Sequence, residues 1–349
     1  MNRRLKGWLY AAGSRVKWWT VVPLAVAVGR VRGRRQVVHA WPSSLPGLGP
    51  RVVLFMHFDG RGAVRRQVLD YIQAFKESGR AVVFVTNSGG LRPEAMEALR
   101  GLCAAVLVRR NIGYDFGAWA DALEHLGLPG PDTEEVIMAN DSVFGPLLPL
   151  GNMLRRLDYA KADIWGLTES WQVRYHLQSF FLAFGPKALR AEGFRAFWAG
   201  VRPVPVKSYI VKTYEVGVTQ AMVKAGLSCA ALWSYEALTA LADREELGRL
   251  LAEEENGPGK GDPVQETRKL QLLRIREGLA QRVALNPTSD LWRQLLLSGF
   301  PFIKRELLRD NPSGVRDVGD WAQVVREEMG ADPEPIRQEL RLMMKGKAP

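Results

Sequence analysis

The sequence has few of the residues that build disulfide frameworks, and it has no long apolar run. It contains two cysteines, Cys103 and Cys229, in 349 residues. They lie far apart in mostly apolar surroundings, which indicates buried free thiols in a reducing compartment. No segment approaches the roughly 18 consecutive apolar residues typical of a transmembrane helix. Hydrophobic residues at 47% and charged residues at 24% exclude a disordered or collagen-like chain. The length allows one large or two modest domains.

Acidic residues are absent from residues 1–50, which carry nine basic side chains. The rest of the chain holds 39 basic and 37 acidic residues, so the net charge of +11 belongs mainly to this leader. The leader also contains Trp8, Trp18 and Trp19. Basic residues beside tryptophans suit an anionic membrane surface, where each cation contributes about 1 kcal/mol. We therefore expect a membrane-proximal leader, with a solvated tail or an RNA-binding segment as alternatives.

From residue 51, apolar β-branched segments alternate with segments of helical periodicity. Strands are predicted at 51–58, 81–86, 104–108, 135–139, 163–168 and 179–184, and helices at 64–75, 93–102, 113–126, 187–199 and 216–225. This alternation predicts an α/β fold with a mostly parallel, Rossmann-like sheet flanked by helices. We expect three parts: the leader 1–50, an α/β domain 51–240 and a helical C-terminal region 241–349.

Polar residues follow the predicted strands at the end where parallel sheets bind ligands. They are Asp59, Asn87, Asn111, Asn140 and Asp141. Among them, Asp141 ends a buried strand and enters a turn, which suits a hard cation or ribose hydroxyls. The alternative is an ordinary turn or helix-capping aspartate. A divalent ion there would neutralise a departing diphosphate.

Residues 111–119 follow a strand and open a helix. Gly113 allows close approach of the backbone to a ligand. The Asp115 carboxylate suits a nucleotide base or a sugar hydroxyl better than a bare phosphate. A capping aspartate among core aromatic residues is the alternative. This segment is therefore a candidate site for a nucleotide base or a sugar hydroxyl.

Three further positions could act on a sugar. His176 and Gln178 alternate onto one face and could bind sugar hydroxyls together, although a lone histidine is more often structural. Glu215 opens a helix and is either a general base or a residue that favours the helix dipole. Glu169, after the predicted strand 163–168, is the second candidate for the base.

Five separated segments resemble the rhamnan synthesis protein F family of bacterial polysaccharide glycosyltransferase-like proteins. The resemblance covers residues 51–321, and its motifs are NIGYDFGAW (111–119), NDSVFGP (140–146), YHLQSFFLAF (175–184), EVGVT (215–219), and NPTSDLW with GFPFIKRELLRDNP (286–312). It implies a GT-A-type nucleotide-sugar transferase with dTDP-L-rhamnose or a similar deoxyhexose as donor. The implied acceptor is a lipid-linked polysaccharide on the inner face of the plasma membrane, where the leader would hold the protein peripherally.

The resemblance also implies roles for individual residues. Asn140 and Asp141 stand where other GT-A enzymes carry an Asp-x-Asp metal motif, so Mg²⁺ or Mn²⁺ on Asp141 is implied, although one of the two acids is missing. Residues 111–115 look like a donor-binding loop, and Glu215 is similar to the acidic residue that supplies the base in inverting GT-A enzymes. The missing acid leaves an alternative: a catalytically inactive assembly factor of a polysaccharide synthesis complex.

Overall fold

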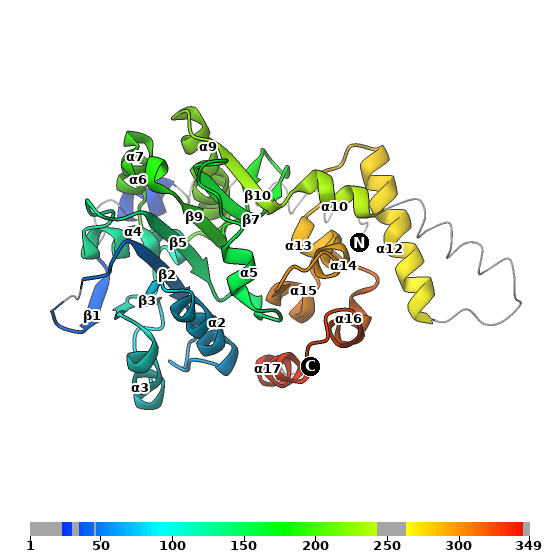
Figure 1. The fold of residues 1–349 in the computed structure, drawn as a ribbon, viewed down its shortest axis with the longest axis horizontal. Coiled ribbons are helices and arrows are strands. Elements are labelled where there is room, and N and C mark those ends of the chain that lie inside the picture. The colour runs from blue at the N-terminus through cyan, green and yellow to red at the C-terminus, as the bar shows by residue number, and fades with distance from the viewer. Residues whose placement is uncertain (1–22, 30–34, 45–46, 243–262, 345–349) are drawn as a thin grey trace, which may run out of the picture.

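The computed structural model describes residues 23–29, 35–44, 47–242 and 263–344 (Figure 1). Within these ranges a nine-stranded sheet forms the centre, in the order β1-β4-β3-β2-β5-β9-β7-β10, with β8 paired to β7. The strands are β1 (Val37–Trp41), β2 (Arg51–His57), β3 (Ala81–Thr86), β4 (Ala105–Arg109), β5 (Glu135–Asn140), β7 (Ile164–Ser170), β8 (His176–Leu177), β9 (Phe181–Phe184) and β10 (Cys229–Trp233).

The four strands β4, β3, β2 and β5 are parallel. The chain moves outward from β2 to β4 and then returns to β5 on the other side of β2. Such a reversal of strand order opens a crevice beyond the carboxyl ends of the two strands, where α/β proteins bind ligands. The topology therefore directs attention to the segments that follow β2 and β5.

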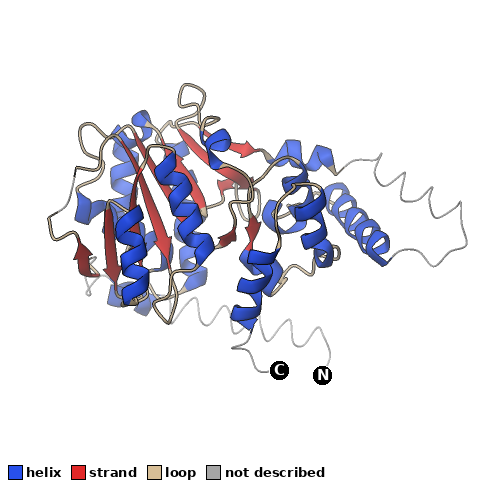
Figure 2. Cartoon of the chain, turned by 60° about the horizontal axis from the view of Figure 1, so that its bottom comes forward, coloured by secondary structure: helices blue, strands red, loops and turns tan. Residues whose placement is uncertain are grey.

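Helices cover both faces of the sheet (Figure 2). Because side chains alternate along a strand, Val53 and Phe55 of β2 face one core while Val52 and Leu54 face the other. The first core is covered by α2 (Arg66–Glu77) and α3 (Pro93–Leu102), and the second by α4 (Tyr114–Leu126). The other helices of this part are α5 (Leu150–Leu154), α6 (Pro186–Arg190), α7 (Glu192–Gly200), α8 (Lys207–Ile210), η1 (Val211–Glu215), α9 (Val216–Lys224) and α10 (Tyr235–Leu241).

The C-terminal helices gather on one side of the sheet (Figure 1). Trp292, Leu307 and Val325 belong to a third core, whereas Ile275 and Leu295 pack in the first core of the sheet. They are α12 (Pro263–Ala280), α13 (Pro287–Asp290), α14 (Trp292–Leu297), α15 (Arg305–Arg309), η2 (Val318–Asp320), α16 (Trp321–Glu327) and α17 (Glu334–Met344). One short strand ties them to the rest: β11 (Ile303–Lys304) pairs with β6 (Val143–Phe144), directly after the end of β5.

A glycine permits this contact. Gly145 has a φ of +124°, and a Cβ added to it would lie 2.5 Å from the carbonyl oxygen of Pro301. Leu147 N–H also donates to that oxygen, at 2.8 Å. Two of the segments singled out in the sequence, 140–146 and 299–312, therefore lie against each other.

The predicted α/β class is confirmed, with a Rossmann-like parallel half. The sheet also contains antiparallel strands that the sequence reading did not anticipate, because β9 runs against both β5 and β7 and β1 runs against β4. The helix predicted at 187–199 is divided at Ala191, which is extended. Strand β1 lies inside the segment predicted as leader, and the three-part division remains a prediction.

Much of the predicted leader, including Trp8, Trp18 and Trp19, lies outside the described residues. Among the residues that are described, no helix combines the length and the apolar character needed to cross a membrane.

Candidate functional site

A pocket of about 440 Å³ opens beside the end of β5. Its wall comes from the start of α4, the turn after β5, strand β8, the η1 segment, helix α13 and strand β11. The pocket therefore joins the carboxyl edge of the sheet to the C-terminal helices.

A chain of hydrogen bonds runs along one wall. Lys304 Nζ donates to Ser142 Oγ at 3.1 Å, and Ser142 Oγ donates to Asn140 Oδ1 at 2.6 Å. Asn140 Nδ2 then donates to Asp115 Oδ2 at 2.7 Å. Each hydrogen bond in this series is donated in the same direction, from Lys304 toward Asp115.

The charged groups of this pocket perturb one another. Burial, together with the negative charges of Asp141 and Glu215, raises the pKa of Asp115 to about 7. Burial lowers the pKa of Lys304, while Glu215 and Asp115 oppose that shift. Shifted acids and bases beside a cavity are typical of functional sites.

The structure brings five of the predicted residues together in this pocket. They are Asp115, Asn140, His176, Gln178 and Glu215. His176 Nδ1 donates to the carbonyl oxygen of Arg174 at 2.8 Å, which leaves Nε2 as the acceptor nitrogen.

The side-chain amide of Gln178 is bonded within the protein at both its oxygen and its nitrogen. Its Oε1 accepts from Thr168 Oγ1 at 2.7 Å, and its Nε2 donates to Asn286 Oδ1 at 3.2 Å and to Thr288 Oγ1 at 3.3 Å. The amide thus holds the start of α13 against the pocket. Binding of sugar by Gln178 remains a prediction, and these contacts give the side chain a structural task.

Asp141 and four other predicted donor-binding residues lie outside the residues that line this pocket. Asp59 accepts from Arg61 N–H at 2.8 Å within its own loop, and Asn87 Oδ1 accepts from the buried Arg109. Asn111 is exposed. Gly113 is left-handed, with φ of +85°, and a Cβ there would lie 2.9 Å from Pro203 Cα. Chain packing accounts for Asp59, Asn87 and Gly113, and a donor contact by any of the four remains a prediction.

Asp141 lies just beside the pocket, in a network of ion pairs. Its Oδ2 is 3.3 Å from Arg305 Nη1, and Arg305 Nη2 is 3.1 Å from Glu339 Oε1 on α17. Arg65 continues the network, with Nε 3.5 Å from Glu339 and Nη2 3.6 Å from Asp59. A guanidinium therefore occupies the position beside Asp141 that a cation would take.

A divalent metal does not fit the residues present. No group of three His, Cys, Asp or Glu side chains is placed to hold an ion anywhere in the described part of the chain. Oxygen-preferring ions such as Mg²⁺ bind through carboxylates, and here the Asp141 carboxylate pairs with Arg305 while the Asp115 carboxylate accepts from Asn140.

Glu169, the second candidate base, lies outside this pocket lining. Its Oε1 accepts from Tyr235 N–H at 2.9 Å, and it contributes to the raised pKa of Tyr175. The alternation of β7 explains this position, since the neighbouring Ser170 lines the pocket.

The sequence reading missed Lys304 as a site residue. It stands in the motif GFPFIKRELLRDNP, which was singled out only as part of a resemblance. The signal that could have found it is the pairing of two motifs around Gly145, and that pairing cannot be read from one chain.

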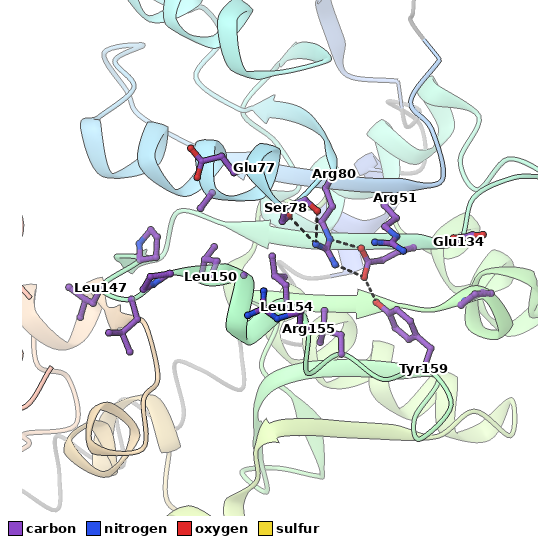
Figure 3. Close-up of a pocket in the computed structure, with 18 residues that line it drawn as sticks. Arg51, Glu77, Ser78, Arg80, Glu134, Leu147, Leu150, Leu154, Arg155 and Tyr159 are labelled. Carbon is purple, nitrogen blue, oxygen red and sulfur yellow. Dashed lines mark hydrogen bonds and ion pairs between the residues drawn. The ribbon is translucent and has the colours of Figure 1, made fainter. Parts of the chain in front are cut away.

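A second and larger pocket, of about 800 Å³, lies at the opposite edge of the sheet (Figure 3). Its lining includes Arg80, Glu135 and Tyr159. Arg80 Nε and Nη2 lie 2.6 and 3.1 Å from the two carboxylate oxygens of Glu135, and Tyr159 Oη donates to Glu135 at 2.8 Å. The hydrogen-bonding groups of these three side chains are therefore paired with one another. The pocket lies at the amino ends of β2 and β5.

Comparison with known proteins finds a family model that matches the central part of the chain. Residues 82–243 match the family model of rhamnan synthesis protein F. The resemblance read from the motifs is therefore confirmed for this segment, which includes 111–119, 140–146, 175–184 and 215–219. The two later motifs lie beyond the matched residues. The match to the rhamnan synthesis family supports a glycosyltransferase.

Curated relatives share 25–28% of their residues with this chain over the matched segments. Virulence protein VirA of Vibrio anguillarum is 28% identical over 255 residues, which cover 72% of this chain and 76% of that protein. The uncharacterized protein y4gN of Sinorhizobium fredii is 25% identical over 189 residues, or 53% of this chain and 49% of that protein.

Among solved structures, a mannosyltransferase from Pyrobaculum calidifontis in complex with GDP-Man and Mn²⁺ aligns over 78% of this chain and 85% of its own. The identity is 13% and the TM-score 0.33. The galactosyltransferase LgtC, in complex with donor and acceptor sugar analogs, aligns over 52% of this chain and 72% of its own. The sequence identity is 14% and the TM-score is 0.30. Similarity at these scores says nothing about the ligands of this chain.

Proposed function

We propose that the protein is a glycosyltransferase that moves a deoxyhexose, L-rhamnose from dTDP-L-rhamnose, onto a lipid-linked polysaccharide. The observation that carries this proposal is the pocket at the carboxyl edge of the sheet, which holds Asp115, Glu215, His176 and Lys304. The family match supports the sugar and the polysaccharide, because the family is described by rhamnan synthesis.

The reaction needs one bond exchange at the sugar. The acceptor hydroxyl oxygen forms a bond to C1 as the bond from C1 to the diphosphate breaks, and the diphosphate keeps that electron pair. Glu215 takes the hydroxyl proton. Its Oε1 accepts from the backbone N–H of Ser179 at 3.4 Å, which orients the carboxylate in the pocket. Nε2 of His176 accepts from a sugar hydroxyl.

Replacement of the base tests this assignment. We expect Glu215→Gln to lower turnover of dTDP-L-rhamnose by about 10²–10⁴-fold, because general bases contribute that much. The measurement is release of dTDP with a lipid-linked rhamnan acceptor. Gln keeps an oxygen for the Ser179 N–H, so the unfolding midpoint in urea should stay close to that of the wild type. Unchanged turnover would reassign the base.

The inactive assembly factor is the second candidate. The observation that favours it is the Arg305 guanidinium beside Asp141, the lone acid of the expected metal motif. Binding of dTDP without turnover of any dTDP-, UDP- or GDP-sugar in the presence of acceptor would favour this role over the transferase.

We further propose that the basic leader holds the protein on the inner membrane face. The test must spare β1, whose residues 37–41 pair with β4, and the helical residues 23–29, of which Ala25 and Val26 pack on the core. Deletion of residues 2–20 should move the protein from the membrane to the soluble fraction. Unchanged fractionation would contradict this role.

A further inference from the structure

Lys304 is held in the pocket by the pairing of two distant segments. In the β6–β11 ladder, Lys304 stands opposite Val143 and Ile303 opposite Phe144. Arg305 N–H also donates to the carbonyl oxygen of Ser142 at 3.0 Å. Three backbone positions in a row, 303–305, are thus fixed against the turn that follows β5.

The ammonium group is fixed as well. Nζ lies 4.6 Å from the centre of the Phe180 ring and 3.1 Å from Ser142 Oγ. An ammonium has three N–H donors, and the bond to Ser142 uses one of them. The remaining donors are available to the pocket that Lys304 lines, with Lys207 exposed on the same lining.

The anions near Lys304 do not form a close ion pair with it. Asp115 and Glu215 act on Lys304 through space, whereas Asp115 takes its short hydrogen bond from Asn140. With a pKa of about 7, Asp115 carries only part of a negative charge at neutral pH. A partly desolvated ammonium in this position favours an additional anion.

The proposed reaction releases a diphosphate, and the residues beside β5 do not fit a divalent ion. We infer that Lys304, assisted by Lys207, binds the diphosphate of the nucleotide donor in place of a metal ion. This inference rests on the proposed function, and it names the group that stabilises the departing diphosphate.

The experiment measures the affinity of purified full-length protein for dTDP, UDP, GDP and thymidine by calorimetry, each in EDTA and in Mn²⁺. We expect the wild type to bind its preferred diphosphate equally in both buffers. Lys304→Gln should weaken diphosphate binding at least tenfold and leave thymidine binding within twofold. Lys304→Arg, which retains the charge, should recover most of the loss. Lys161→Gln, on an exposed loop, removes the same charge outside the pocket and should change nothing.

Other outcomes separate the inference from the function beneath it. Diphosphate binding that requires Mn²⁺ and ignores Lys304→Gln would overturn the inference and keep the transferase. Equal loss of thymidine and diphosphate binding in Lys304→Gln, with no recovery in Lys304→Arg, would make Lys304 structural and also overturn it. If the wild type binds none of the nucleotides in either buffer, the proposed function fails and the inference fails with it.

Discussion

The two edges of the sheet carry buried charges in opposite ways. At the amino edge, Glu135 is bonded by both Arg80 and Tyr159, so this buried carboxylate has its cation and a hydroxyl donor inside the protein. At the carboxyl edge, Asp115 and Lys304 are linked through two intermediate side chains and stay apart from each other. The amino-edge pocket is the larger one, at about 800 Å³ against about 440 Å³. Our assignment of function to the carboxyl edge therefore rests on the availability of polar groups and not on pocket volume.

The comparison predicts its largest effect at the amino edge, on stability. Arg80→Met should lower the free energy of unfolding by about 3–5 kcal/mol, because it leaves the Glu135 carboxylate buried without its cation. Urea unfolding measures the loss. The double variant Arg80→Met with Glu135→Leu should recover most of it. A loss below about 1 kcal/mol would show that the pair is solvated and would break the contrast between the edges.

At the carboxyl edge, removal of a charge should stabilise the protein. The pKa of Asp115 is raised to about 7 in the folded state, so the folded protein keeps a proton that the unfolded chain loses above about pH 4. This group therefore costs stability as pH rises through that interval, and the cost is complete above about pH 7.

Asp115→Asn tests this sign. Asparagine still accepts from Asn140 and never ionises, so the variant should be more stable than the wild type by about 1–2 kcal/mol near pH 8. The advantage should shrink steadily toward about pH 4. Urea midpoints along this pH series measure it. A constant difference between variant and wild type would mean that Asp115 titrates normally.

The smallest effect is expected at Glu169, which lies on the same strand as the pocket residue Ser170 but has its own partner. Glu169→Gln should cost at most about 1 kcal/mol, since the amide oxygen can still accept from Tyr235 N–H. Turnover should equal that of the wild type. A loss as large as that expected for Glu215→Gln would make Glu169 the base.

Local pattern predicted much of the sheet and five of the residues that line the pocket. The strands β2, β3, β4 and β5 were predictable because their buried β-branched runs are bounded by clear turns. Asp115 and Asn140 were found because parallel strands bring their carboxyl ends to one edge.

The remaining features depend on contacts between distant segments. The direction of β9 and the pairing of β11 with β6 leave no periodic signal in the sequence. Lys304 reaches the pocket only through that pairing. Gln178 also bonds to Asn286, and Asp141 bonds to Arg305. Each of these partners is likewise more than a hundred positions away in the sequence.

The close approach of Gly145 to Pro301 has a consequence for biosynthesis. Lys304 follows Ser142, its hydrogen-bonding partner, by 162 positions. A ribosome therefore delivers the sheet and the acidic wall of the pocket well before the lysine, and the nascent chain has an incomplete site until residue 304 has been added. Competence to hold an anion at this position is acquired late, together with the docking of the C-terminal helices.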